Sequence, residues 1–381
     1  MRGSWRIGRV MGIDLMVDLS WFLIVALMIY SLGFIEFPRE LHPGMRPARA
    51  DAVSITLGIV VSLMLFASVL AHELAHSWMA LECGIAVKRI TLFIFGGVAQ
   101  IAEEPDRPRA EFLIAVMGPL MSLMLAALFG AAWVWLTVLD STQALGAGLK
   151  PLVILLATLT QANGSLALFN LAPGFPLDGG RVLRAILWAR FRDIRRATLW
   201  ATRAGQGIAL LFVLSGAAQF FFGLGGSGIW LGLIGIFLWN AARDGYRQTL
   251  TLATLRGVTV AQLMTREISV VAPELSLAEF IDAHLLPRRE QTFVVCAGET
   301  PIGIIALEHL KRFKRSTWQT RLVRDAMLPL FALPILTPEH NAATALARLN
   351  LANQSELPVI VEGQVVGFLG EEELFRFLKL Q

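Results

Sequence analysis

The side chains best suited to chemistry in this sequence are two histidines and a glutamate within an otherwise apolar segment. They are His72, Glu73 and His76, in the order His-Glu-Leu-Ala-His. On a helix, residues i and i+4 lie on one face, so both imidazoles can reach one ion while Glu73 lies about a quarter-turn away, near a metal-bound water. Polar groups at membrane depth are costly and are seldom left there without a partner or a role. The spacing therefore favours a metal site over an accidental match.

Zinc suits this set of ligands. It would polarise a substrate carbonyl and lower the pKa of its water from ~15.7 toward about 7, while Glu73 takes the proton of that water and later delivers it to the leaving amine. A catalytic zinc usually has three protein ligands in addition to water. The two histidines supply two of them, so a third ligand must come from another part of the chain.

Asp178 is the expected third ligand, by exclusion. The other histidines lie in a loop or in the less apolar C-terminal part: His42, His284, His309 and His340. Glu82 is too close in sequence to fold back onto the same helix face, and Asp140 falls at the opposite membrane surface. Asp178 lies in segment 170–181, whose prolines and glycines would break a helix. Irregular backbone at membrane depth is tolerated only where protein or a water-filled cavity satisfies it. The alternative is an ordinary helix end at the cytosolic face.

Three further polar residues lie in the apolar segments. Asn170 is the best placed to bond the substrate carbonyl or its oxyanion, as side-chain amides do in other hydrolases. A structural hydrogen bond from Asn170 to the backbone freed near Pro173 is equally compatible with the sequence. Ser122 and Asn163 are interpreted as positions of interhelical packing or hydrogen bonding.

The composition places much of the chain in lipid. Of 381 residues, 55% are hydrophobic and 16% are charged, which is too apolar for a soluble protein of this size. The long apolar runs end before Gly257, so we expect a membrane domain at 1–248 and a soluble domain at 258–381. The excess arginines, which give a net charge of +4, cluster beside apolar runs and favour topology signals over nucleic-acid binding. Cys83 and Cys296 lie in different regions and predict no disulfide framework.

The expected fold is a polytopic α-helical membrane protein with a small β-sheet at the membrane face, followed by an α/β module. A span needs about 20 helical residues. Six apolar stretches approach that length: 19–36, 52–81, 111–139, 151–177, 204–222 and 227–242. Residues 5–18 alternate as a short strand, and residues 85–101 predict a strand pair that turns at Gly96 and Gly97.

Positive charge in the short loops sets the expected orientation. Arginines and lysines gather before the first stretch, after the second and after the fourth, whereas the loop after the fifth has none. The loop after the first stretch, with Arg39, Arg46 and Arg49, argues mildly against this scheme. We expect a multi-pass protein of the plasma or inner membrane with its N-terminus and its C-terminal domain in the cytoplasm.

The C-terminal domain contains an internal repeat. Segments 260–313 and 323–377 each have a short lead ending in Met, a proline about ten residues later, an amphipathic helix, and then strand, turn and strand. Two copies imply a pair of matched modules packed on each other.

The membrane part resembles a known family through a set of ordered motifs. These are His72 to His76 followed by Ser77, Phe95-Gly96-Gly97, Gly118-Pro119, Asn163, and the segment 169–181. In this order and spacing they resemble the site-2 protease family of intramembrane metalloproteases. The resemblance implies a zinc site of His72, His76 and Asp178, Glu73 as the catalytic glutamate, and a bent or unwound substrate helix admitted between spans. Ser122 departs from the pattern, since the family often has Asn after the Gly-Pro pair.

The same resemblance implies what the enzyme cuts and how the substrate is held. The hairpin at Gly96 and Gly97 is similar to the membrane-associated strand of the family, which helps to present the substrate in extended form. Single-span or already shortened membrane proteins, such as anti-sigma factors or tethered transcription factors, are the implied substrates.

The repeat resembles a tandem CBS-domain pair, a regulatory module that often binds adenosine nucleotides and pairs into dimers. In that family a Thr or Ser and, three residues later, an Asp hold the ribose. Ala306 with His309 and Gly370 with Glu373 stand at these places. Only Glu373 keeps a carboxylate, so any nucleotide site is expected to be single, and a homodimer would form through these modules.

Two other functions remain to be weighed. A CBS-regulated ion or metal transporter would need polar residues along a path across the bilayer, whereas the polar membrane residues gather in the cytosolic half of two predicted spans. A pseudoenzyme that binds a membrane partner without cutting it is disfavoured by the intact set of Glu73, both histidines and Asp178.

Overall fold

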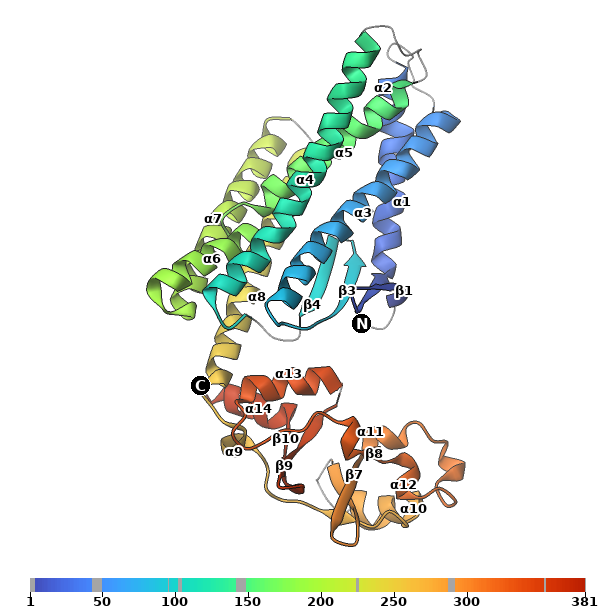
Figure 1. Cartoon of the computed structure of the whole chain (residues 1–381), viewed down its shortest axis with the longest axis vertical. Helices are drawn as coiled ribbons and strands as arrows, with labels where there is room; N and C mark the ends of the chain where they lie inside the picture. The colour runs from blue at the N-terminus through green and yellow to red at the C-terminus, as the bar shows by residue number, and fades with distance from the viewer. Residues whose placement is uncertain are drawn as a thin grey trace. The chain divides into compact units, whose positions relative to one another are not determined.

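The computed structural model describes residues 4–42, 50–94, 96–101, 105–141, 149–223, 226–286, 292–352 and 354–380. Over these residues the chain divides into two compact units, Met1–Arg247 and Gln248–Gln381. The first unit is mostly helical with a small sheet, and the second is built from short helices and strands (Figure 1). The predicted fold class is confirmed at this level: a polytopic helical part and an α/β part.

Long helices dominate the first unit. They are α1 (Leu19–Tyr30), which continues through a π-helical turn at Ser31–Glu36 into α2 (Phe37–Leu41), then α3 (Ala52–Glu82), α4 (Pro108–Ser141), α5 (Lys150–Asn170), α6 (Asp178–Phe191), α7 (Ile194–Phe221) and α8 (Gly226–Arg256). Helix α4 packs against α3, α5 and α6, and α6 packs against α7. The exposed faces of these helices carry many large apolar side chains, as expected for contact with lipid.

The described residues contain five helices long and apolar enough to cross a membrane, rather than the predicted six. They are Leu19–Leu41, Ala52–Glu82, Pro108–Leu139, Lys150–Asn170 and Ile194–Phe221. The sixth predicted stretch, 227–242, forms the first half of α8. It is followed by Arg243 within the same helix and is not among these five helices.

Helix α3 begins and ends at clear local signals. The Asp51 carboxylate accepts the Ser54 N–H (2.8 Å), and the Ser54 hydroxyl oxygen accepts the Asp51 N–H (3.0 Å), which is a capping box. Hydrogen bonds from the Ser54 backbone and from His42 lower the pKa of Asp51, just outside the span, to about 2. At the other end the helix stops before Gly84, which has a φ of +79°.

The small sheet has the strand order β1-β2-β3-β4, with β1 (Ser4–Val10), β2 (Ile13–Asp18), β3 (Val87–Phe93) and β4 (Gly96–Ile101). Strands β2 and β3 run parallel, and the outer pairs are antiparallel. Ile13 and Ile90 are fully buried in a cluster with Ala80 of α3 and Ile114 of α4. The sheet is thereby fixed against the C-terminal half of α3.

Two details of the predicted strands were wrong. Residues 5–18 form a hairpin rather than one strand, because Met11 and Gly12 both have positive φ and close a tight two-residue turn. Gly96 and Gly97 do not form the second turn. They are the first residues of β4, paired with Phe93 and Leu92 of β3.

The second unit contains two copies of one element order. The first copy has α9 (Val260–Leu263), β5 (Val270–Val271), α10 (Leu277–Phe280), β6 (Thr292–Ala297), β7 (Thr300–Ala306) and α11 (Leu307–Leu310). The second has α12 (Val323–Ala326), β8 (Leu328–Pro329), α13 (Ala342–Ala352), β9 (Glu356–Val361), β10 (Gln364–Gly370) and α14 (Glu371–Lys379). Each copy carries one antiparallel hairpin, β6 with β7 and β9 with β10.

The two copies exchange their lead segments. The Val260 N–H, in the first lead, donates to the carbonyl of His340 in the second copy (2.8 Å), and the Val323 N–H, in the second lead, donates to the carbonyl of Leu275 in the first (2.8 Å). Val260 and Val323 are both fully buried in the opposite core. The two copies therefore fold as one body.

Candidate metal centre

Three side chains predicted as metal ligands converge in the first unit. His72 and His76 come from the buried face of α3, and Asp178 is the first residue of α6. The Asp178 Oδ2 atom lies 3.1 Å from His72 Nε2 and 3.2 Å from His76 Nε2, and the two Nε2 atoms are 3.2 Å apart. Among the described residues this trio could hold one metal ion.

The second nitrogen of each ring is fixed by helix α4. His76 Nδ1 lies 2.7 Å from the carbonyl oxygen of Ile114, and His72 Nδ1 lies 2.8 Å from the hydroxyl of Ser122. A carbonyl can only accept, so Nδ1 of His76 carries the proton and its Nε2 keeps a free lone pair. Both rings thus present Nε2 to the same point.

The spacing of the donor atoms fits zinc. Tetrahedral zinc bound by nitrogen and oxygen at about 2.0–2.1 Å has its ligand atoms ~3.3 Å apart. The separations of 3.1–3.2 Å are within about 0.2 Å of that value. Two imidazoles and one carboxylate are also a donor set that catalytic zinc sites use.

Gly118 of α4 lets this helix approach the site. A Cβ atom at that position would collide with Nε2 of both His76 and His72. Glycine is therefore required for α4 to lie directly against the two imidazoles, and Pro119 follows within the same helix.

The backbone that precedes Asp178 is irregular, as the sequence indicated, and is held by other backbone groups. Residues 171–177 connect α5 to α6, and the Phe175 N–H donates to the carbonyl of Ala201 in α7 (3.2 Å). A Cβ on Gly179 would collide with the carbonyls of Leu171 and Ala172. Tight packing against the preceding loop thus explains the glycine after Asp178.

An ion pair buried between helices anchors α6. Arg184 of α6 bonds Glu111 of α4, and the two residues are 5% and 1% exposed. The Arg184 guanidinium also lies 5.0 Å from the centre of the Phe175 ring. Since Arg184 is on the same helix as Asp178, this pair fixes the position of the carboxylate relative to α4.

Neither Glu73 nor Asn170 belongs to the trio. Glu73 is half-buried, and a Cβ added to Gly97 of β4 would lie within 3.4 Å of its Oε1 and collide with its Cγ. Strand β4 therefore passes directly over the Glu73 side chain. Asn170 is the last residue of α5 and is half-buried, and within the described part of the chain its amide makes no hydrogen bond to the backbone near Pro173.

Glu373, the residue predicted to contact a nucleotide, and His309, at the equivalent place in the first copy, each cap their own helix. Glu373 Oε2 accepts the Gly370 N–H (3.1 Å), and Nδ1 of the fully buried His309 accepts the Ala306 N–H (3.1 Å). The Nε2 atom of His309 lies 3.2 Å from Oε1 of Gln354.

Sequence reasoning did not assign Ser122, Gly118 or the Glu111–Arg184 pair to this site. The sequence held a weak signal for the Glu111–Arg184 pair, because a charged side chain next to an apolar stretch usually has a partner of opposite charge. The hydrogen bond of Ser122 was anticipated only as interhelical, without its partner His72.

Comparisons with known proteins identify the family. Residues 60–214 match the sequence model of peptidase family M50. The protein Rip3 of Mycobacterium tuberculosis, whose name describes it as a zinc metalloprotease, is 34% identical over 383 residues, covering 99% of this chain and 93% of that protein. The solved site-2 protease of Methanocaldococcus jannaschii is 28% identical, with a TM-score of 0.39 over 63% of this chain and 94% of that chain. A solved CBS-domain structure is 17% identical, with a TM-score of 0.29 over 32% of this chain and 98% of that chain.

A metalloprotease is the class that these findings define. The chain belongs to peptidase family M50, the site-2 protease family. It is accordingly a zinc metalloprotease and a multi-pass membrane protein that acts on membrane substrates. The resemblance to this family predicted from the motifs is confirmed.

Proposed function

We propose that the enzyme hydrolyses a peptide bond of a membrane-spanning substrate at the site formed by His72, His76 and Asp178. The observation that carries this proposal is the convergence of the three donor atoms within 3.2 Å of one another, with both Nδ1 atoms engaged elsewhere. These three residues would hold one zinc ion through two Nε2 atoms and Oδ2. Bound zinc supplies Lewis acidity that polarises the substrate carbonyl and acidifies the attacking water.

Protons in the reaction are handled by Glu73. As the neighbour of His72 on α3, it is the carboxylate closest in sequence to the ligands, yet it belongs to no ligand group. Glu73 accepts the proton of the attacking water and returns it to the amine that leaves. Asn170, whose amide makes no hydrogen bond to the backbone near Pro173 among the described residues, donates its N–H to the developing oxyanion.

Strand β4 is the surface we assign to the substrate backbone. Gly97 lies directly over Glu73, so a segment paired with β4 in extended form would pass the carboxylate. An extended segment exposes its carbonyls, whereas a helical span keeps them hydrogen-bonded. Single-span or already shortened membrane proteins, such as anti-sigma factors, meet this requirement.

The second unit is proposed as a tandem CBS-domain regulator, supported by its two matched copies and exchanged leads. Glu373 is the residue we assign to a nucleotide ribose, and binding would have to displace the hydrogen bond from the Gly370 N–H. A nucleotide bound to these modules, or dimerisation through them, changes activity only if it favours one of two conformational states of the enzyme over the other. Calorimetry of the full chain with AMP, ADP and ATP tests this: one site lost in Glu373→Ala is expected, and two sites would contradict it.

The orientation remains part of the proposal. Basic residues before α1, between α3 and α4, and around α6 favour a cytoplasmic N-terminus and a cytoplasmic second unit, in the plasma or inner membrane.

The decisive experiment replaces Glu73 by Gln. The variant should lose cleavage of a single-span substrate while retaining zinc, because the carboxylate moves protons and does not bind the metal. Glu82→Gln, on the exposed end of the same helix, is the matched control and should keep both properties. Cleavage at near wild-type rate by Glu73→Gln would rule out the mechanism. A transporter would instead keep its ion flux in this variant.

A further inference from the structure

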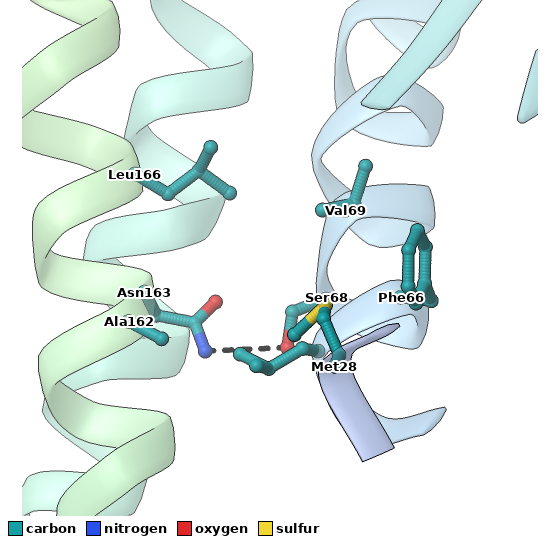
Figure 2. Close-up of a pocket in the computed structure, with 8 residues that line it drawn as sticks. Met28, Phe66, Ser68, Val69, Ala162, Asn163 and Leu166 are labelled. Atoms are coloured by element: carbon teal, nitrogen blue, oxygen red, sulfur yellow. Dashed lines mark hydrogen bonds between the residues drawn. The ribbon is translucent and has the colours of Figure 1, made fainter. Parts of the chain in front are cut away.

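A pocket lies one helical turn from the metal centre, between α1, α3 and α5. Its volume is about 190 Å³, and its walls are mainly apolar, from Met28, Leu65, Phe66, Val69, Ala162 and Leu166. Two polar side chains, Ser68 and Asn163, complete the lining. Figure 2 shows the two helices α3 and α5 on either side of the pocket and Met28 of α1 below it.

The Asn163 amide is only half satisfied. This residue is 1% exposed, and its Nδ2 donates to the Ser68 hydroxyl oxygen (3.2 Å) and to the Leu159 carbonyl (2.9 Å). Its Oδ1 atom has no hydrogen-bond partner among the described residues. In Figure 2 this oxygen points away from Ser68, toward the space between Leu166 and Val69.

The hydrogen bonds of the neighbours fix this orientation of the amide. Ser68 donates its own hydroxyl proton to the Met64 carbonyl (3.0 Å), so it accepts from Asn163 and cannot donate to it. Rotating the amide by 180° would lose the bond to Leu159 as well. A buried acceptor left in this way is costly, and a donor that entered the pocket and reached Oδ1 would relieve that cost.

The pocket is in register with the catalytic residues. Ser68 and Val69 precede His72 and Glu73 by four residues on α3, and Leu166 precedes Asn170 by four on α5. Residues i and i+4 lie on the same face, about 6 Å apart along the axis. For a substrate that runs along α3 and rises about 3.3 Å per residue, the pocket would lie about two residues from the bond to be cut.

We propose that this pocket is a substrate subsite that binds one apolar side chain of the unwound membrane segment, while Asn163 Oδ1 accepts the backbone N–H of that residue. The proposal rests on the proposed protease function. A cavity of ~150 Å³ lined by apolar residues accommodates a benzene ring, so about 190 Å³ suits a leucine or phenylalanine side chain. Unwinding frees backbone N–H groups that have no other acceptor in lipid.

The alternative occupant is a lipid acyl chain, which is equally apolar. A hydrocarbon chain has no donor for Oδ1 and would leave the amide unsatisfied. The unpaired acceptor therefore favours a peptide over a lipid, and the experiment below separates them.

The test uses the full chain and a series of synthetic single-span peptides. Each peptide replaces one backbone amide within three residues of the cut by an ester, which removes the N–H and keeps the side chain. Binding is measured in the Glu73→Gln background with zinc bound, and cleavage is measured in the wild type. One position, about two residues from the cut, should lose on the order of tenfold in affinity and in kcat/KM.

The Asn163→Leu variant should bind the all-amide peptide more weakly by about the same factor. Its affinity should not change further when the ester stands at that one position. Thr160→Val, which removes a hydroxyl from the same helix outside the pocket, is the matched control and should respond to the ester as the wild type does. Val69→Phe fills the pocket. This variant should bind and cleave a peptide with leucine at that position more weakly, and a peptide with alanine there as well as the wild type does. Zinc content verifies that each variant is folded at the metal centre.

Several results would overturn the subsite. The first is that the ester and Asn163→Leu reduce affinity independently, so that their factors multiply. The second is an equal loss of affinity for an ester at every position. The third is an effect of Val69→Phe that depends on the lipid chain length and not on the peptide. The proposed function fails separately: if the peptide binds with this dependence but the wild type does not cut it, the subsite stands and the protease mechanism falls.

Discussion

Two buried histidines, one in each unit, use their ring nitrogens in different ways. In the first unit, His76 engages Nδ1 with the Ile114 carbonyl, while its Nε2 faces His72 and Asp178. In the second unit, His309 uses Nδ1 for the Ala306 N–H and Nε2 for Gln354. The two rings are about equally inaccessible, so burial alone does not separate a metal ligand from a helix cap.

The difference lies in which atoms share a common point. Nε2 of His76 lies next to two other atoms that carry electron pairs, Nε2 of His72 and Oδ2 of Asp178. Such atoms repel one another at this distance unless a cation or a proton lies between them. His309 has a neutral hydrogen-bond partner on each nitrogen, and the Glu308 carboxylate lies 3.9 Å from its Nε2. Burial outweighs that carboxylate and lowers the pKa of His309, so the ring stays neutral as a cap. A buried histidine therefore indicates chemistry only when one of its nitrogens remains available.

The largest effect that would sharpen this comparison is expected for Gly118→Ala. The added methyl group collides with both Nε2 atoms in the first unit, so zinc binding and cleavage should be lost together. Gly164→Ala on α5, where a Cβ meets nothing within 4 Å, is the control and should retain both. Metal analysis of the purified proteins measures the outcome. Full zinc occupancy in Gly118→Ala would show that α4 does not lie against the imidazoles as described.

An intermediate effect is expected for Ser122→Ala. This change removes the partner of His72 Nδ1 but leaves all three ligand atoms, so zinc affinity or activity should fall by about 10–100-fold. Ser62→Ala, which removes a buried hydroxyl bonded to Gly58 in α3, controls for loss of an interior serine. Competition with a zinc chelator measures the affinity. Equal behaviour of the two variants would remove the assigned role of Ser122.

The smallest effect is expected for His309→Ala. Loss of this cap should destabilise α11 by about 1 kcal/mol and leave zinc content unchanged. Hydrogen exchange of segment 300–310 in the full chain measures the change, with His284→Ala as a control whose Nδ1 has no partner among the described residues. Because the folded pKa of His309 is lowered, wild-type protection should also weaken as pH falls through about 6.5. Faster cleavage or zinc loss in His309→Ala would contradict separate roles for the two units.

The sequence predicted the parts of the site that follow from local spacing and scarcity. The i, i+4 pair His72 and His76 and the isolated Asp178 were selected in this way, and the structure brings their donor atoms together, although zinc binding by these residues remains a prediction. Ser122 and His72 are 50 residues apart, and Glu111 and Arg184 are 73 apart. These contacts depend on how α4 docks against α3 and α6, which no local pattern encodes.

The errors in the fold have the same origin. Alternation along residues 5–18 predicted extended structure, but positive φ at Met11, a non-glycine residue, is not a local preference and the hairpin was missed. The sixth predicted span, 227–242, begins beside residues that the structure does not describe, and it stays a prediction. In contrast, apolar runs bounded by polar caps, such as Asp51 before α3, were assigned correctly.

The most direct test of the account is the zinc content of Asp178→Ala, measured with its activity on the same preparation. Asp193→Ala is the matched control, because Asp193 is a carboxylate that accepts the backbone N–H groups of Arg195 and Arg196 at the start of α7 and does not belong to the ligand set. The account predicts about one zinc per chain in the control and loss of both zinc and cleavage in Asp178→Ala, since one of three protein ligands is removed. A full complement of zinc with only modestly lowered cleavage in Asp178→Ala would contradict it, and the third ligand would then lie elsewhere.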